Sequence, residues 1–251
     1  MGRRATTPAV SAAVRQALSV AVATGLYGVS FGALSVVAGL DVWQTMALSL
    51  VMFSGGSQFA FIGVAGSGGS PGAAIATAAL VGLRNALYGP QVAPLIGVSG
   101  PRRLLAAQLT IDESTAVGTA QRDPAAARAG FWWTGAGVFL LWNAFTLVGA
   151  LVGDAAGDPR RYGLDAAAAA AFLALVWPRL SNRTAQAVAG AAVVVALSTT
   201  PVLPSGVPVL LAAVVAVLVG VLWRSRPAAP VTAGSHRPEG ASVRRDEEAG
   251  S

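Results

Sequence analysis

The sequence predicts an all-α membrane protein, a polytopic bundle of helices that crosses a lipid bilayer several times. The first observation is composition: of 251 residues, 54% are hydrophobic and only 11% are charged, which is too apolar for a soluble domain of ordinary composition. The second is that the apolar residues fall into separate stretches, many of them near the roughly 20 residues that one helical crossing needs. The lipid bilayer is therefore the expected surrounding of most of the chain.

Seven apolar segments follow one another along the chain, with boundaries that are uncertain by a few residues. They are Gln16–Leu40, Val42–Ala65, Ala73–Val98, Gly130–Val152, Leu164–Trp177, Ala185–Thr199 and Val207–Trp223. The first is too long for the core of a signal peptide and has no convincing cleavage site, so we expect a retained first helix.

The distribution of arginine predicts the orientation, because short cytoplasmic loops collect basic residues. The arginines stand at the N-terminus, between segments three and four, between segments five and six, and after segment seven: Arg102, Arg103, Arg122, Arg128, Arg179, Arg183, Arg224 and Arg226. Both termini are then cytoplasmic, which requires an even number of crossings. We expect six crossings plus one segment that enters and leaves by the same face. The alternative is seven crossings with the N-terminus outside, which the arginines at 160–161 favour.

The second segment is the best candidate for this re-entrant element. It contains "FSGGSQF" at 53–59, where two glycines and three polar residues interrupt the apolar run. The third segment contains "RNALYGPQ" at 84–91, where a Gly-Pro pair follows polar residues. We expect discontinuous helices at both places, since irregular backbone at membrane depth is tolerated only against protein or a water-filled cavity.

Three parts make up the expected domain organisation. Residues 1–12 form a flexible cytoplasmic N-terminus and residues 13–223 form the transmembrane domain. Residues 224–251 mix Pro, Gly, Ser and both charge signs, so they form a disordered C-terminal tail that cannot bury enough apolar surface to fold.

Several function classes are excluded by residues that the chain lacks. There is no cysteine, and the single histidine, His236, stands in the tail, so thiolate metal sites and Cys or His nucleophiles are not expected. No phosphate-binding loop occurs either. We expect no enzyme, no metal and no cofactor. The net charge of +6 orients the chain in a bilayer rather than binding nucleic acid.

The two broken segments carry the candidate binding residues. Half-helix ends near the middle of a membrane bind substrates in many transporters, and an intramembrane arginine is a functional-site hypothesis by default. Arg84 can hold a carboxylate through its planar guanidinium; the alternative is that it binds helix-end carbonyls or extends to the interface. The accompanying candidates for substrate contact are Asn85, Ser57, Gln58, Tyr88 and Gln91.

The stretch "LTIDES" at 109–114 contains the adjacent acids Asp112 and Glu113. On a helix, neighbours point about 100° apart, so the two acids are not expected to address one ligand as a pair. Asp112 can pair with Arg84, receive a substrate ammonium or carry a coupling proton. The alternative is a helix start in which Thr110 or Asp112 caps the first turn and Glu113 favours the helix dipole.

Glycines and one asparagine complete the candidates. Gly25, Gly28 and Gly32 share one helical face and are expected to allow close helix packing or to border the pathway. Asn143 interrupts the fourth segment. An asparagine on a spanning helix forms hydrogen bonds to a neighbouring helix more often than to a ligand, so we expect that role here, with pocket lining as the alternative. An apolar wall for a substrate side chain is expected from Val51, Phe53, Phe59 or Phe61.

Four ordered blocks, "GLYGVSFGAL", "FSGGSQF", "LRNALYG" and "LTIDES", resemble the AzlC family of branched-chain amino acid permeases. The resemblance covers residues 25–115. It implies export of branched-chain amino acids across the bacterial inner membrane, with a small AzlD-like membrane protein as partner. We expect the proton gradient to drive this export. The family pattern usually has His where this chain has Asn85, so the resemblance carries over Arg84 but no role for an imidazole.

Two other functions fit the same sequence features. A passive channel would conduct without saturation or dependence on the proton gradient. A non-transporting membrane subunit that scaffolds a partner would show no flux at all. Coupling ion, direction of transport and oligomeric state leave no signature in the sequence.

Overall fold

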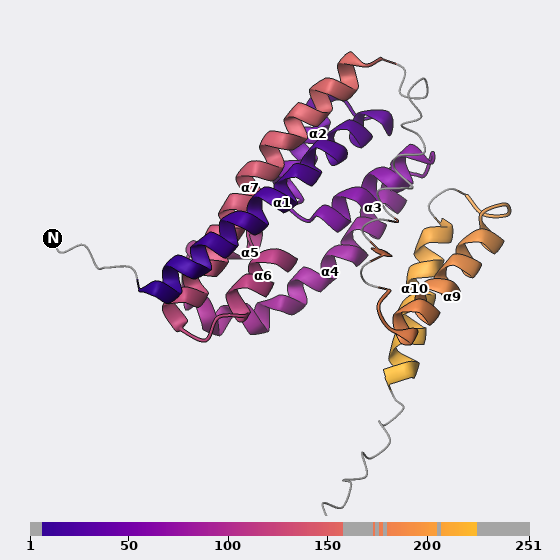
Figure 1. The fold of residues 1–251 in the computed structure, drawn as a ribbon. Coiled ribbons are helices and arrows are strands. Elements are labelled where there is room, and N and C mark those ends of the chain that lie inside the picture. Colours follow the sequence, from indigo (N-terminus) through magenta and orange to yellow (C-terminus); the bar gives the residue numbers. More distant parts are fainter. Residues whose placement is uncertain (1–6, 158–172, 174–175, 178–179, 205–206, 225–251) are drawn as a thin grey trace, which may run out of the picture.

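The computed structural model describes residues 7–157, 173, 176–177, 180–204 and 207–224. Three predicted features lie partly or wholly outside them: residues 1–6, most of the fifth apolar segment and the C-terminal tail from residue 225 on. Within the described residues every regular element is a helix (Figure 1), so the all-α prediction is confirmed there. These helices are α1 (Pro8–Val37), α2 (Val42–Val51), α3 (Gly55–Gly66), α4 (Pro71–Ile96), α5 (Arg102–Gln108), α6 (Asp112–Thr119), α7 (Pro124–Ala155), α9 (Arg183–Thr199) and α10 (Val207–Arg224).

Two of these helices, α1 and α7, are long and apolar enough to cross a membrane by the usual measures of length and hydropathy. The helices α2, α9 and α10 are apolar but shorter. The all-helical architecture of the described residues is consistent with a helical membrane protein, while the number of crossings stays a prediction.

The three longest helices begin in the same way. A side-chain oxygen caps the helix start, and a proline follows at the first helical position. Proline is favourable there because an N–H at this position would have no acceptor within the helix. The pairs are Thr7-Pro8, Ser70-Pro71 and Asp123-Pro124. Helix α1 starts at Pro8, so residues 8–12 of the expected N-terminal segment belong to this helix.

Helices α1 and α7 pack against each other in parallel (Figure 1) and form the most extensive contact of the fold. Small residues bring the two backbones together. A Cβ added at Gly25 would lie 2.6 Å from the Cβ of Leu141, and one at Gly28 would lie 2.5 Å from the carbonyl oxygen of Trp142. A Cβ at Gly32 would overlap the Thr146 carbonyl oxygen. All three predicted packing glycines thus lie in this contact.

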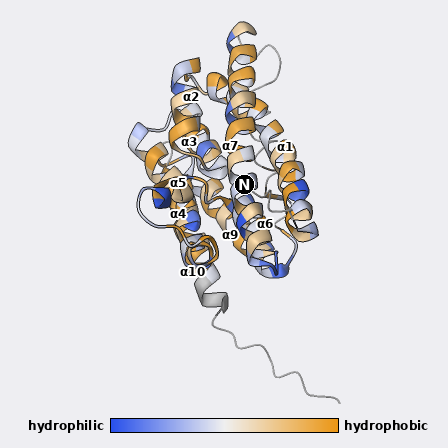
Figure 2. Cartoon of the chain, turned by 90° about the vertical axis from the view of Figure 1, so that its left-hand side faces the viewer, coloured by the Kyte–Doolittle hydropathy of each residue, from blue (hydrophilic) through white to orange (hydrophobic). Residues whose placement is uncertain are grey.

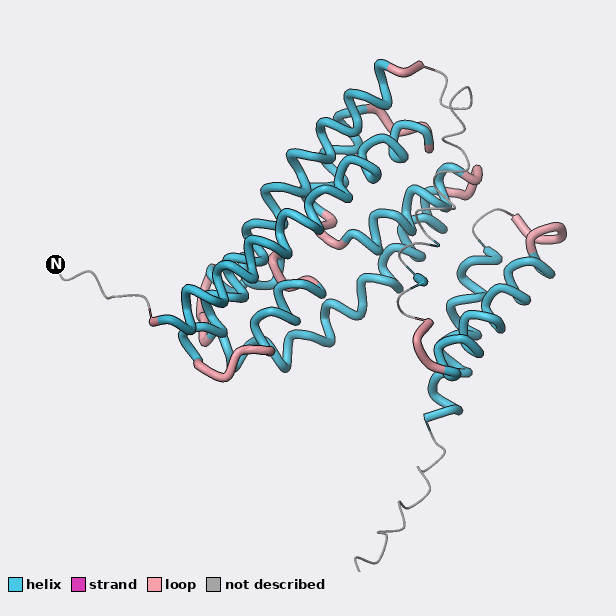
Figure 3. Tube along the Cα trace, viewed as in Figure 1, coloured by secondary structure: helices cyan, strands magenta, loops and turns pink. Residues whose placement is uncertain are grey.

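The second apolar segment is broken where the sequence predicts it. Helix α2 ends at Val51, α3 begins at Gly55, and residues 52–54 form the break (Figure 3). Helix α2 enters from the end where α1 stops, and α3 returns to that end, since a Cβ at Gly66 would lie 3.1 Å from the Cβ of Ala38. The pair α2–α3 is therefore a helical hairpin with the expected break, and its re-entrant position in a bilayer stays a prediction.

The predicted break at 84–91 is wrong. Helix α4 continues through Gly89 and contains both Pro90 and Pro94 (Figure 3). The helix survives its missing hydrogen bonds because both of its halves are held by packing, which is how prolines are accommodated in membrane helices. Its first half lies on α3, and in its second half Val92 and Ile96 pack with Phe131 of α7.

A second hairpin, which the sequence analysis did not predict, consists of α5 and α6. Its tip is the break at 109–111. At the tip, Gln108 donates from Nε2 to the carbonyl oxygen of Leu50, 3.0 Å away at the end of α2. At the far end of α6, Gln121 donates to Gln16 near the start of α1. This hairpin therefore enters from the opposite end of the bundle, and the two tips meet in its middle.

The first six helices thus repeat one pattern in inverted orientation. In each half, a long helix is followed by a hairpin that enters from the end where the long helix stops: α1 with α2–α3, and α4 with α5–α6. Inverted repeats with discontinuous helices at their interface are a common architecture of secondary transporters.

Aromatic side chains fill the core beside the hairpin tips. The ring of Phe31 lies 5.7 Å from that of Phe59 in an edge-to-face arrangement and 6.1 Å from that of Trp142, which stacks on it. Phe53, within the first break, contacts Phe139 of α7 at 4.9 Å. These contacts fix both sides of the break, because aromatic pairs in these geometries add to the free energy of burial.

The outside of the bundle is apolar over most of its helical surface (Figure 2). Large side chains that a soluble protein would bury point outward, among them Trp43, Leu87 and Leu104, which are 83%, 73% and 76% exposed. Arginines gather at one end, where α1 and α7 begin and the second hairpin enters: Arg15, Arg102, Arg103, Arg122 and Arg128.

Candidate functional site

A cavity of about 490 Å³ lies where the two hairpin tips meet. This volume falls within the range of roughly 300–1,000 Å³ that is typical of small-molecule sites. Both tips contribute: residues 54–56 start α3, and residues 111–113 start α6. The other described lining residues are Ala23, Thr24, Tyr27, Phe59, Ala60, Val81, Arg84, Asn85, Trp142 and Val176.

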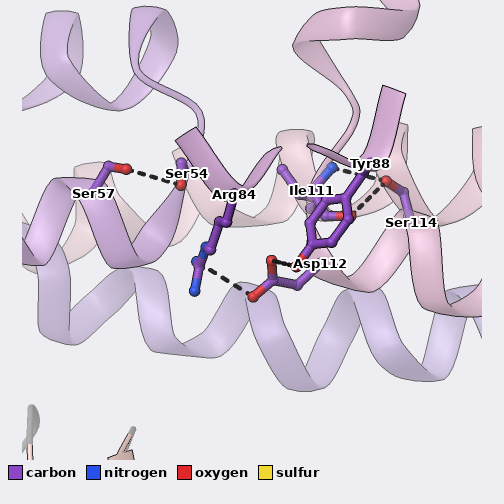
Figure 4. A network of polar contacts seen from close by, with 7 residues as sticks. All are labelled: Ser54, Ser57, Arg84, Tyr88, Ile111, Asp112 and Ser114. Carbon is purple, nitrogen blue, oxygen red and sulfur yellow. Dashed lines mark hydrogen bonds and ion pairs between the residues drawn. The ribbon is translucent and has the colours of Figure 1, made fainter. Parts of the chain in front are cut away.

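An ion pair joins α4 to the start of α6 inside this cavity. Arg84 Nη2 lies 3.3 Å from a carboxylate oxygen of Asp112, and the Tyr88 hydroxyl donates to the other oxygen at 2.9 Å (Figure 4). The Arg84 and Asp112 side chains are 29% and 24% exposed, so the pair is only partly buried. The structure thus places Arg84 against Asp112, which is one of the three alternatives for this acid.

The start of α3 leaves backbone amides available beside Arg84. The first N–H groups of an α-helix have no intrahelical acceptor, and the N-cap residue Ser54 makes no capping bond with its side chain. Instead, its oxygen accepts from the Ser57 hydroxyl at 3.2 Å (Figure 4). A Cβ at Gly56 would lie 2.8 Å from Arg84 Nη2, so the guanidinium lies directly against this helix end.

Arg84 and the α3 terminus together form the positive side of the cavity. The Nε atom of Arg84 is buried and has no hydrogen-bond partner among the described residues. The same holds for the Oδ1 atom of Asn85. A helix N-terminus carries a partial positive charge and attracts anions, so this side of the cavity has two features that favour an anionic group.

The start of α6 forms the negative side. Asp112 and Glu113 occupy its first turn, and both line the same cavity. Although adjacent acids were not expected to address one ligand as a pair, both border one cavity here. Within the break, Ser114 donates to the carbonyl oxygen of Leu109 at 2.6 Å and accepts from the Ile111 N–H at 3.0 Å (Figure 4).

Gln58 lies behind the cavity rather than in its lining. Its amide nitrogen donates to the carbonyl oxygens of Ser49 and Met52, at 3.3 and 2.7 Å, and its oxygen accepts from the Trp142 indole at 2.9 Å. The side chain is fully buried. These contacts satisfy carbonyls at the end of α2, so Gln58 holds the break in shape.

The remaining predicted residues are divided between several places. Ser57 lines a second cavity of about 400 Å³, and Asn85 and Ser54 line both cavities. Tyr88 reaches the site through Asp112, whereas Gln91 is exposed and absent from the described cavity linings. Asn143 is buried and donates to the Phe139 carbonyl oxygen of its own helix at 2.7 Å.

The apolar wall differs from the expected one. Of the four candidates only Phe59 lines the cavity, while Val51 is 78% exposed. The wall is otherwise made by Ala23, Ala60, Val81, Ile111 and Trp142. Sequence reasoning missed Gln108 altogether, because its partners at the end of α2 are far away in the chain and no local pattern marks the contact.

No group of three or more metal-binding side chains occurs among the described residues. The described lining of the first cavity combines a positive side, a negative side and an apolar wall.

Comparison with known proteins agrees with this picture. A family model described as "AzlC protein" matches residues 19–156, more than half of the 251-residue chain, and covers both hairpins. No curated protein and no solved structure matches. The family is a transport-related one rather than a family of enzymes. The chain belongs to the AzlC family, a family of membrane proteins associated with branched-chain amino acid transport.

Proposed function

We propose that this protein exports branched-chain amino acids, and other small apolar amino acids, across the bacterial inner membrane. Export is driven by the proton gradient, and a small AzlD-like membrane protein is the partner. The observation that carries the proposal is the cavity at the two hairpin tips, where Arg84 and the α3 terminus face the acids of α6.

An amino acid matches this cavity at three points. Its carboxylate binds beside Arg84 and the amides at Gly55 and Gly56, since a planar guanidinium and a helix terminus both favour anions. Its ammonium fits at the first turn of α6, where Asp112 and Glu113 supply the opposite charge. A branched side chain then lies against the apolar wall, which includes Ala60 and Val81.

The two hairpins supply a route to each side of the membrane. They enter from opposite ends of the bundle and reach the same cavity with their tips. A movement of one hairpin opens the cavity toward one side, and a movement of the other opens it toward the opposite side. Alternating access around a central site is the general mechanism of transporters with inverted repeats.

The arginine-rich end of the bundle is the cytoplasmic one in this proposal. Arg15, Arg102, Arg103, Arg122 and Arg128 stand at that end, and basic residues in short loops are retained on the cytoplasmic side. The N-terminus lies there too, and with six crossings the C-terminus does as well.

Efflux from proteoliposomes tests the function directly. Vesicles containing the full-length protein are preloaded with labelled leucine, isoleucine or valine, with and without the small partner and an inward proton gradient. Saturable efflux that the gradient accelerates supports the proposal. Flux that neither saturates nor responds to the gradient indicates a channel, and no flux in any condition, partner included, indicates a scaffolding subunit.

A further inference from the structure

We propose that the groove between α5 and α7 binds an anionic phospholipid, whose phosphate contacts Arg102 and Arg128 and whose acyl chain lies along the groove. The groove shares no described lining residue with the first cavity. The inference is therefore independent of which molecule the protein transports.

The groove is a cavity of about 460 Å³ between α5 and α7. Leu105 of α5 and Trp133 of α7 border it and are exposed, and Ala136 and Phe139 continue the lining along α7. Apart from Gln108, the described lining residues have apolar or aromatic side chains. Such a surface matches a hydrocarbon chain, because exposed apolar patches mark sites of contact with a membrane or a protein.

Two arginines lie at the end of the groove where α5 and α7 begin. Arg102 precedes Leu105 by three residues and Arg128 precedes Trp132 by four, so each lies on the same side of its helix as a lining residue. Both arginines are exposed, and neither forms an ion pair with a described carboxylate. The groove thus combines an apolar length with a positive end.

A phospholipid presents the matching order of groups along its length. Trp132 lies about 6 Å further along α7 than Arg128, and tryptophan side chains favour the level of the lipid head groups. Basic pockets between membrane helices bind anionic head groups. An apolar helix of a protein partner would match the groove but would leave both arginines unused, so the charges favour a lipid.

Occupation of the groove affects the contact between the two hairpins. Gln108 lines the groove and donates from Nε2 to the carbonyl oxygens of Leu50 and Val51, at 3.0 and 3.4 Å, at the end of α2. A lipid that contacts both α5 and α7 therefore supports the side chain that joins the hairpin tips. Because a ligand that binds only the native state shifts the unfolding equilibrium, the bound lipid stabilises the folded protein.

Quenching of tryptophan fluorescence by brominated lipids is the test. The full-length protein is reconstituted into phosphatidylcholine vesicles that contain rising fractions of brominated phosphatidylglycerol or brominated phosphatidylcholine. Bromine in an acyl chain quenches the tryptophans that it contacts, and W132F/W133F gives the background from the other tryptophans. For the native protein we expect a preference for phosphatidylglycerol on the order of tenfold, since each arginine near a membrane surface attracts anionic lipid.

Two double variants with the same change in charge separate this groove from general attraction to the membrane. R102Q/R128Q should lose the preference. R103Q/R122Q should keep it, because Arg103 Nε donates to the Val98 carbonyl oxygen at 3.1 Å and Arg122 precedes the start of α7.

The variant A136L tests the groove while both arginines stay in place. The larger side chain fills part of the groove, so A136L should lose the preference as well. The unfolding temperature in detergent gives a second readout: phosphatidylglycerol should raise it more than phosphatidylcholine does in the native protein and in R103Q/R122Q, and the two lipids should act equally on R102Q/R128Q and A136L.

Equal quenching by the two lipids in the native protein would overturn the proposal. An equal loss of preference in the two double variants, or a preference that A136L retains, would overturn it too. Displacement of the brominated lipid by the small membrane partner would assign the groove to a protein interface instead.

Discussion

Arg84 and Asp112 form an ion pair of 3.3 Å that connects the crossing helix α4 to the tip of the second hairpin. The same guanidinium touches the start of α3, at the tip of the first hairpin. One side chain thus lies between the ends of two half-helices that enter the bundle from opposite directions. Its position explains why an arginine occurs in so apolar a segment.

Replacement of Arg84 by Gln should abolish leucine transport. The substitution removes the cation that faces the carboxylate and leaves Asp112 without its partner. A hydrogen bond to a charged group contributes about 1.5–3 kcal/mol, so leucine affinity should fall by roughly tenfold to over a hundredfold. Calorimetry measures the affinity and proteoliposome efflux the transport.

R84K is the matched variant for that experiment. It keeps the charge but lacks the planar donor arrangement, so it should bind leucine more weakly than the native protein and better than R84Q. Equal transport by R84Q and the native protein, at equal amounts in the membrane, would refute the role of Arg84.

Alanine at Gly56 should impair binding without unfolding the protein. The added Cβ would lie 2.8 Å from Arg84 Nη2, which displaces the guanidinium from the α3 terminus and narrows the place for a carboxylate. We expect leucine affinity to fall about tenfold. G89A is the control, because nothing lies within 4 Å of a Cβ at Gly89. Equal leucine affinities of the two variants, measured by calorimetry, would contradict the assigned carboxylate position.

Leucine at Ala60 should change which amino acids are transported. Ala60 lies one helical turn after Gly56 on α3 and lines the cavity, so a larger side chain occupies the space of the substrate's branched group. One methylene more or less in an apolar pocket is worth about 1–3 kcal/mol. In A60L, leucine efflux should therefore fall tenfold or more relative to alanine efflux. A93L, at an exposed position of α4 outside the described cavities, should leave this ratio unchanged.

Local patterns in the sequence were sufficient to predict part of this structure. The run "FSGGSQF" places two glycines and three polar residues within an apolar segment, and the chain breaks there. The Gly-Pro pair at 89–90 is an equally strong local signal, yet α4 continues through it. Packing of Val92 and Ile96 on neighbouring helices holds the second half in line, and such distant contacts leave no mark in the segment itself.

The candidate site, too, was predictable only in part from the sequence. Its charged residues were predictable, because charge is rare in an apolar chain and each charged residue requires a reason. Gln58 was a reasonable candidate on the same grounds. Its hydrogen bonds to Ser49, Met52 and Trp142 form only because α3 folds back onto the end of α2 and because α7 turns Trp142 toward Gln58. Neither arrangement can be read from the sequence around Gln58. The second hairpin was missed because α5 and α6 are too short, and the residues around them too polar, to stand out as a membrane segment.

Leucine at Gln58 should destabilise the protein more than it affects substrate recognition. The substitution removes the amide that donates to two carbonyls at the end of α2 and accepts from the Trp142 indole. Each buried polar group left without a partner costs about 1–3 kcal/mol, so the unfolding temperature in detergent should drop clearly in Q58L. Q91L provides the comparison, since Gln91 is exposed and its loss should leave stability and transport unchanged. If Q58L instead kept the native unfolding temperature and lost leucine affinity, Gln58 would be a substrate ligand after all, and the end of α2 would have to be satisfied by other groups.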